Sequence, residues 1–183
     1  EFLVVDPQVG KSLAQYLSDM QFSCCKSALG IDVGQHLEQE KVIDWEKPFL
    51  EQRHYAYVCS RYTKPIIVNK PCRWGAGFHR VKGHNYSIDP NLYLFHFGSF
   101  DMKMIESRYN DKDRMGAGWG KHIARRAKTI FMVSKAKAKV SETYIKLARL
   151  VQTCLRPIYA LNKPSMAGWK LIIEIPKRFS NVL

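Results

Sequence analysis

Short apolar runs rich in β-branched and aromatic residues alternate with polar segments over the first half of the chain. Four of these runs have the length and composition of buried strands: Phe2–Val5, Tyr55–Cys59, Pro65–Val68 and Leu92–Phe97. The last is apolar at successive positions, as in a central strand covered on both faces. Between the first two runs, Ser12 and Gln15 have capping-box spacing at the start of an amphipathic helix. We therefore predict an α/β fold with a mixed sheet flanked by helices.

The remaining segments are less regular. Ser23–Arg53 has weak periodicity, so we expect irregular structure there, with a short helix near Pro48–Arg53. A turn at Trp74–Gly77 should lead into a strand at Phe78–Val81, and Leu171–Ile175 should be a last strand.

Helices should dominate from Asp101 onward. Asp101–Arg114 has the mixed charges of a surface helix. A stripe of Val140, Tyr144, Leu147, Val151 and Cys154 predicts a long helix that ends at Pro157. We predict one domain over residues 1–183, with a core in 1–115 and a basic helical extension in 116–183.

The composition is that of a globular protein, because 46% of the residues are hydrophobic and 25% are charged. No apolar run reaches the ~18 residues of a transmembrane helix. The five cysteines, an odd number, fit a reducing compartment, so we expect a cytoplasmic protein, with attachment at the inner face of the membrane as an option. Cys59 and Cys72 stand far apart in the sequence and predict no zinc site.

Positive charge is concentrated after residue 50. Residues 1–50 have a balance of −4 and residues 51–183 a balance of +17. Such a charge attracts polyanions, meaning nucleic acid, anionic lipid or a diphosphate. Residues 121–150 contain nine Lys or Arg and one Glu, which is typical of a solvated helix but also of a helix bound to an anionic membrane, here through residues 121–155. Two modules without catalysis are the alternatives: a basic nucleic-acid-binding module, with Tyr86, Tyr93 and Tyr109 among the cations, and a membrane-peripheral module.

Several motifs together resemble family 2-like glycosyltransferases. Glu1–Val5 resembles the tail of an Asp-x-Asp-Glu-Phe strand, and Lys64–Val68 a lysine-proline start of a sheet strand. Gly77-Phe78-His79 and Leu94-Phe95-His96-Phe97 are similar to the two histidine-bearing strands of that family. Gln52-Arg53 and Ile175–Phe179 also resemble its bacterial members.

The resemblance implies a GT-A fold that binds a nucleotide sugar through a divalent cation, Mn²⁺ or Mg²⁺. It places the two metal-binding aspartates directly before Glu1, so we expect the chain to be the later, inactive part of the catalytic domain. The acceptor is then a hydroxyl of a glycan, lipid or protein, and the anomeric configuration inverts.

The resemblance also implies site residues. His96 and Glu1 are candidate metal contacts, and His79 is a candidate contact of the diphosphate. The alternatives are a core histidine for His96, a structural role for His79 and a solvated carboxylate for Glu1.

Other candidates follow from residue chemistry. Arg73, Arg80 and Lys82 are suited to phosphate oxygens, and Trp74 to stacking on a sugar, although a solvated surface and a packing anchor are the alternatives. Catalytic-base candidates are Asp32, Asp44 and Glu46. By resemblance, Arg108 and Arg114 are candidates on the acceptor side.

Overall fold

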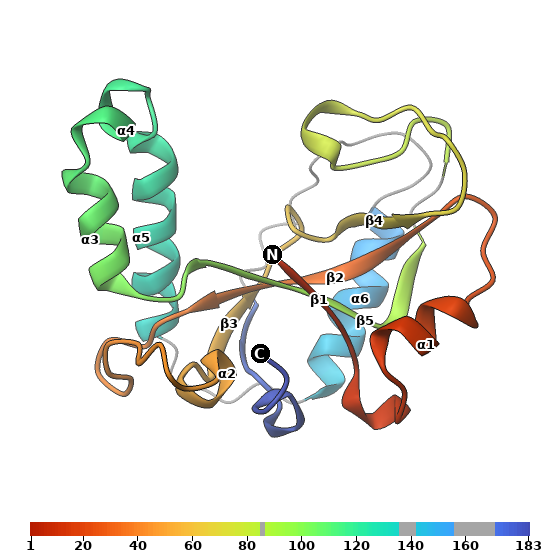
Figure 1. Cartoon of the computed structure of the whole chain (residues 1–183), viewed down its shortest axis with the longest axis horizontal. Coiled ribbons are helices and arrows are strands. Elements are labelled where there is room, and N and C mark those ends of the chain that lie inside the picture. Colours follow the sequence, from red (N-terminus) through yellow and green to blue (C-terminus); the bar gives the residue numbers. More distant parts are fainter. Residues whose placement is uncertain (85–86, 136–141, 156–170) are drawn as a thin grey trace. The chain divides into compact units, whose positions relative to one another are not determined.

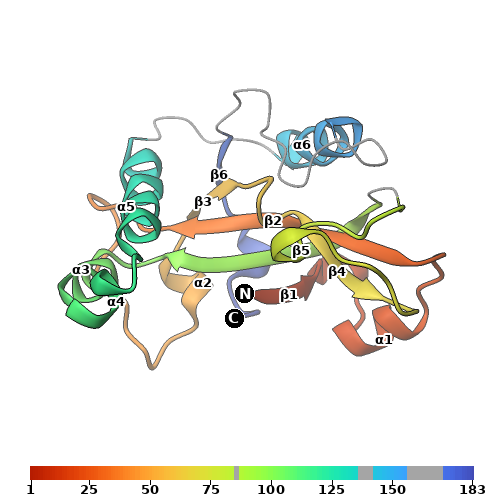
Figure 2. The ribbon, with the colours of Figure 1, turned by 90° about the horizontal axis from the view of Figure 1, so that it is seen from above.

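The computed structural model describes residues 1–84, 87–135, 142–155 and 171–183. Its strands form a mixed sheet in the order β1-β5-β2-β3-β6, with β4 also paired to β2 (Figures 1 and 2). The strands are β1 (Phe2–Val5), β2 (Cys25–Gly34), β3 (Tyr55–Val58), β4 (Lys64–Val68), β5 (Ile88–Ser99) and β6 (Ile172–Glu174). The α-helices are α1 (Leu13–Ser18), α2 (Phe49–Gln52), α3 (Met102–Asn110), α4 (Lys112–Gly116), α5 (Gly120–Ser134) and α6 (Glu142–Leu155). The predicted α/β class, with helices flanking a mixed sheet, is confirmed.

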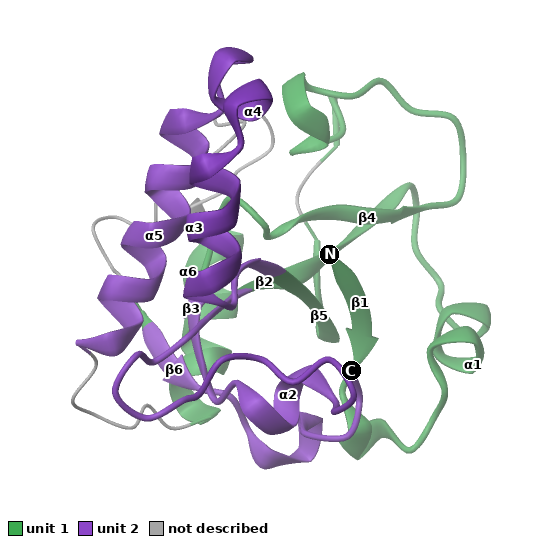
Figure 3. Ribbon diagram, turned by 60° about the vertical axis from the view of Figure 1, so that its left-hand side comes forward, with its two compact units in different colours: residues 1–31, 58–96, 141–171 green, residues 32–57, 97–140, 172–183 purple. Residues whose placement is uncertain are grey.

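The chain divides into two compact units, each built from three segments (Figure 3). Unit 1 comprises Glu1–Ile31, Val58–His96 and Ser141–Leu171, and unit 2 comprises Asp32–Tyr57, Phe97–Val140 and Ile172–Leu183. The strands β2, β3 and β5 contribute residues to both units. The division of residues 1–183 into a core and an extension stays a prediction.

In unit 1, helix α1 packs against one face of the sheet. Val5, Ala28, Leu92 and Leu94 form a buried cluster, against which side chains of α1 such as Leu13 and Leu17 pack. The predicted capping box starts this helix, since Ser12 Oγ accepts from Gln15 N at 3.2 Å and Ser12 N donates to Gln15 Oε1 at 2.9 Å. Alternate strand residues point to opposite faces, so this cluster defines the α1 face of the sheet.

Helix α6, also in unit 1, is fixed to β5 by the half-buried cation of Arg149. The Arg149 guanidinium lies 4.8 Å from the centre of the Tyr93 ring and donates to the carbonyl oxygens of Leu92, at 3.2 Å, and Asp89. Burial lowers the pKa of Arg149, while Tyr93 and Asp89 oppose that shift. Because Tyr93 alternates with Leu92 and Leu94, α6 packs on the face opposite to α1.

In unit 2, helices α3 and α5 lie side by side (Figures 1 and 3). Ile105, Ile123 and Ile130 form their shared core. Helix α5 also packs on the end of β2, where a Cβ on Gly34 would lie 2.9 Å from Val133 Cγ2. Glycine at position 34 therefore permits this close approach.

Three sequence predictions of secondary structure are wrong. The segment expected to be irregular contains the ten-residue strand β2, although the short helix near Pro48 is confirmed as α2. Phe78–Val81 is not a strand, because a 3₁₀ helix at Ala76–Phe78 precedes His79. The stripe predicted for the last helix is displaced, since Tyr144 and Leu147 are 49% and 37% exposed.

The buried face of α6 instead carries Ile145, Ala148 and Gln152. The packed side of the helix includes the polar residues Arg149 and Gln152. A stripe defined by apolar residues alone therefore identifies the wrong face of α6. Val140 and Pro157 lie outside the described residues, as do Tyr86, Lys137 and Lys139. Among the described helices, none is both long enough and apolar enough to cross a membrane.

Candidate functional site

A tight turn of unit 1, Cys59–Thr63, lies directly on β2. Cys59 N donates to Gly30 O and Gly30 N donates to Thr63 Oγ1, both at 2.9 Å. A Cβ on Gly30 would lie 2.4 Å from Thr63 N and from the carbonyl carbon of Tyr62. Only glycine allows the backbone of the turn to lie so close to the strand.

Substitution of this glycine tests how firmly the turn is held. Gly30→Ala should lower the free energy of unfolding by about 3 kcal/mol, because backbone atoms of the turn must move to admit the methyl group. Chemical denaturation measures the change. Gly116→Ala is the matched control, since nothing lies within 4 Å of the added Cβ at the end of α4. Equal stabilities of Gly30→Ala and wild type would show that the turn is not constrained by β2.

The same turn holds both candidate histidines. The Tyr62 ring stacks on the His96 imidazole, with centroids 3.7 Å apart and planes 19° apart. His79 Nδ1 lies 3.0 Å from Arg61 O, so Nδ1 carries the donated hydrogen, and in the neutral ring the lone pair is on Nε2. Adjacent residues of one turn thus contact the two side chains, which are 17 positions apart in the sequence.

Glu1 is the third predicted site residue in this region. In the β1–β5 register Phe2 pairs with Phe95 and Leu3 with Leu94, so one further step sets Glu1 opposite His96. Glu1 Oε2 also accepts from Lys64 Nζ at 2.8 Å, in an ion pair whose side chains are 33% and 16% exposed. His96 follows Leu94 by two residues, as Gly30 follows Ala28, which places them all on the α1 face.

The parallel direction of β2 and β5 puts His96 near an edge of the sheet where ligands commonly bind. Ser27 N bonds to Ser87 O and Gln35 N to Ser99 O, so β2 and β5 run parallel. His96 is 9% exposed and lies toward the carboxyl end of β5. Open α/β sheets bind ligands outside the carboxyl ends of parallel strands. We define Glu1, Tyr62, Lys64, His79 and His96 as the histidine cluster.

The candidate phosphate-binding residues belong to one loop of unit 1. Trp74 pairs with Val81, Gly75 N donates to Arg80 O, and Lys82 N donates to Arg73 O at 2.7 Å. This pairing sets Arg73 and Lys82, both exposed, side by side. The loop also includes His79, so the cations and one member of the histidine cluster share a segment.

Trp74 is a packing residue. It packs against a cluster of Cys24, Cys25 and Val81, together with Cys72. Cys72, which stands alone in the sequence, therefore lies near two other thiols in the fold. Burial, and next the neighbouring Cys24 and Cys72, raise the pKa of Cys25 to about 11, which disfavours the thiolate that binds metals. No disulfide forms among the five cysteines, all of which the structure describes.

The candidate bases lie in unit 2. Asp32 is a buried residue of β2, with Thr129 Oγ1 3.5 Å from its Oδ2. Asp44 and Glu46 are exposed in a loop, where the Glu46 backbone N–H and then Lys47 hold the pKa of Asp44 below its usual value. A general base works best with a pKa near the working pH, so this shift does not favour Asp44. The assignment of a base stays a prediction.

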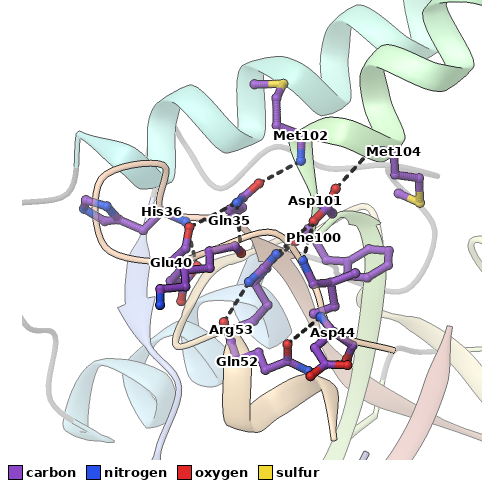
Figure 4. Close-up of polar contacts among 12 residues, drawn as sticks. Gln35, His36, Glu40, Asp44, Gln52, Arg53, Phe100, Asp101, Met102 and Met104 are labelled. Atoms are coloured by element: carbon purple, nitrogen blue, oxygen red, sulfur yellow. Dashed lines mark hydrogen bonds and ion pairs between the residues drawn. The ribbon is translucent and has the colours of Figure 1, made fainter. Parts of the chain in front are cut away.

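A buried polar network in unit 2 was not predicted from the sequence (Figure 4). Arg53 Nη2 lies 3.1 Å from Asp101 Oδ2, and both side chains are almost completely buried. Arg53 also donates to the carbonyl oxygens of Phe100 and, at 2.8 Å, Gln52. Desolvation lowers the pKa of Arg53, and the charges of Glu40 and Asp101 oppose that shift.

The carboxylate of Asp101 joins three segments of the network. Its Oδ1 caps α3 by accepting from Met104 N at 3.0 Å, and its Oδ2 accepts from Ile43 N at 2.9 Å. Glu40 plays a similar part, because its two oxygens accept from His36 N and His54 N at 2.7 and 2.6 Å. The sequence-based view of Asp101 as a surface residue is wrong. The network is structural, since each charge in it is satisfied within the protein.

Arg108 and Arg114 remain acceptor-side candidates by resemblance alone. Arg114 Nε pairs with Asp111 Oδ2 at 2.9 Å on the surface. Burial lowers the pKa of Arg108, and Arg126 and Arg114 lower it further. These neighbours make the α3–α5 region strongly cationic.

A resident metal would find few donors in the described residues. They contain no group of three or more His, Cys, Asp or Glu side chains arranged to hold an ion. Glu1 and His96, opposite each other in the register, offer one carboxylate and one imidazole. Such a pair could complete a site only with ligands from elsewhere.

No protein-family model, curated protein or solved structure matches the chain.

Proposed function

We propose that the chain is part of a family 2-like glycosyltransferase with a GT-A fold, which transfers a sugar from a nucleotide sugar to a hydroxyl with inversion. The observation that supports this proposal is the histidine cluster. Sequence motifs indicate Glu1, His79 and His96, and each of the three contacts the turn Cys59–Thr63 or the next residue, Lys64.

The proposed reaction is a displacement at the anomeric carbon. The acceptor oxygen forms a bond to that carbon, the bond to the phosphate oxygen breaks, and the nucleoside diphosphate leaves with the electron pair. A carboxylate takes the acceptor proton. Negative charge grows on the leaving diphosphate, so positioned imidazole and basic side chains lower the barrier.

In this proposal His96 and His79 contact the diphosphate region, and Arg73, Arg80 and Lys82 supply positive charge from the loop. Tyr62 and Lys64 are positioning residues, because they hold the His96 ring and the Glu1 carboxylate. A bound Mn²⁺ or Mg²⁺ would neutralise diphosphate charge. Glu1 and His96 are the candidate donors here, and the resemblance assigns the other ligands to an Asp-x-Asp motif directly before Glu1.

The test is turnover by the parent protein with a panel of nucleotide sugars and Mn²⁺. We expect release of nucleoside diphosphate that stops when EDTA removes the metal, and little or no release by residues 1–183 alone. Robust turnover by residues 1–183 would contradict the proposal that the metal-binding half lies upstream. A parent reading frame without Asp-x-Asp before Glu1, and without turnover, would contradict the function itself.

A basic nucleic-acid-binding module is the second candidate, favoured by the +17 balance of residues 51–183. Its signature would be binding to random oligonucleotides that weakens steeply with salt, together with a melting temperature that nucleotide sugars leave unchanged. The transferase proposal expects nucleotide sugars to raise the melting temperature of the parent protein.

A further inference from the structure

An apolar groove runs between α3 and α5 in unit 2. Its volume is about 360 Å³, and its lining includes Met102, Ile105 and Tyr109 from α3 and Ile123, Ala127 and Phe131 from α5. Glu106 and Asn110 are its polar members. Tyr109 and Phe131 are 58% and 51% exposed, so two aromatic rings lie open to solvent at the groove.

Cations flank this groove on α5. The helix contains Lys121, Arg125, Arg126 and Lys128 and has no acidic residue. Lys121 and Lys128, both exposed, share a helix face with Phe131, because offsets of three, seven and ten residues bring side chains to one side. The groove thus has an apolar floor, two exposed aromatic rings and lysines along its α5 edge.

We propose that this groove face binds the surface of a bilayer that contains anionic phospholipid. The rings of Tyr109 and Phe131 enter the boundary between head groups and acyl chains, and Lys121 and Lys128 contact lipid phosphates. A basic helix with an apolar side is the arrangement that binds such an interface, and long lysine side chains reach outward to the head groups while their stems cover apolar surface.

The choice of a lipid surface over other anions follows from the apolar half of the face. A nucleic-acid backbone would contact the lysines but would leave the groove and Phe131 exposed to water. A bilayer satisfies both halves, since the acyl region takes the rings and the head groups take the charges.

The proposed lipid-binding face differs from the segment 121–155 that the sequence suggests for membrane attachment. It uses only part of that segment and includes residues outside it. Arg149 of α6 is held by β5 within unit 1 and is not available to lipid. Residues of α3 belong to the groove instead. This inference does not rest on transferase activity, and its test needs neither a nucleotide sugar nor turnover.

Co-sedimentation of the chain with mixed phosphatidylglycerol–phosphatidylcholine vesicles tests the proposal. We expect binding to the mixed vesicles that weakens with salt, and little binding to pure phosphatidylcholine. Lys121→Glu/Lys128→Glu and Phe131→Ser should each weaken binding by at least about tenfold, the first through lost attraction and the second through lost insertion.

Lys41→Glu/Lys70→Glu is the matched control, because it changes the net charge equally at two exposed lysines outside the groove. It should reduce binding less than twofold, and melting temperatures of all variants establish that each is folded. Equal losses in the two double variants would overturn the proposal in favour of a non-specific charge effect. Wild-type binding by Phe131→Ser would also overturn it, and oligonucleotide binding lost only in Lys121→Glu/Lys128→Glu would assign the face to nucleic acid.

Discussion

Asp101→Ala should lower the free energy of unfolding by about 3 to 5 kcal/mol, the usual cost of removing one partner of a buried ion pair. The substitution leaves the Arg53 side chain, which is 1% exposed, without the carboxylate with which it forms its ion pair. It also removes the acceptor of Ile43 N and the N-cap of α3 at Met104 N. Urea unfolding of the chain, followed by circular dichroism, measures the change.

Asp111→Ala is the control that separates the cap from the buried charge. Asp111 caps α4 by accepting from Arg114 N at 3.0 Å, as Asp101 caps α3, but its ion pair with Arg114 lies on the surface. Loss of this exposed cap should cost about 1 kcal/mol. Similar losses for the two alanine variants would show that the buried ion pair adds nothing to the cap.

A second variant covers the case in which Asp101→Ala does not fold. Asp101→Asn keeps an acceptor for the cap and removes the charge, so its loss should lie between those of the two alanine variants. In a double variant, Arg53→Met should recover part of the loss caused by Asp101→Asn, because the guanidinium charge is then no longer buried without its paired carboxylate. A double variant as unstable as the sum of the single variants would contradict direct coupling between the two side chains.

The sequence predicts those elements whose local pattern agrees with their final environment. β1, β3, β5 and the capped helix α1 are of this kind, because alternating or continuous apolar residues and a capping box are visible in the chain itself. The sequence does not indicate β2, because Gly30, Asp32 and Gly34 interrupt its apolar pattern. The two glycines are explained only by segments distant in sequence, the Cys59–Thr63 turn and Val133, which lie against the strand.

The candidate site also contains some residues that the sequence indicates and others that only the fold reveals. Motif resemblance selects His79, His96 and Glu1, but the stacking partner Tyr62 depends on how a turn folds onto β2 and leaves no local signal. The Arg53–Asp101 pair joins residues 48 positions apart, so charge spacing along the chain gives no indication of it. Asp101 directly precedes a predicted helix, which is the position of an N-cap. This signal could have distinguished Asp101 from the charged residues on the surface of that helix.

His96→Ala should lower the turnover of the parent protein by about 100-fold or more, comparable to the loss of one preorganised group that stabilises a developing anion. His54→Asn is the control, since the His54 imidazole is 53% exposed and lies in unit 2. Its turnover should remain within about twofold of wild type. A melting temperature of His96→Ala close to that of wild type would separate a chemical effect from unfolding.

Tyr62 provides a graded comparison with His96. If the stacked ring only positions the imidazole, Tyr62→Phe should retain most of the turnover because it keeps the ring.

Turnover of nucleotide sugars by the parent protein, compared between wild type and His96→Ala, tests the central claim most directly. The account predicts metal-dependent release of nucleoside diphosphate by wild type and its near-complete loss in a folded His96→Ala variant. Equal kcat and KM for the two proteins would contradict the assignment of the histidine cluster to the diphosphate.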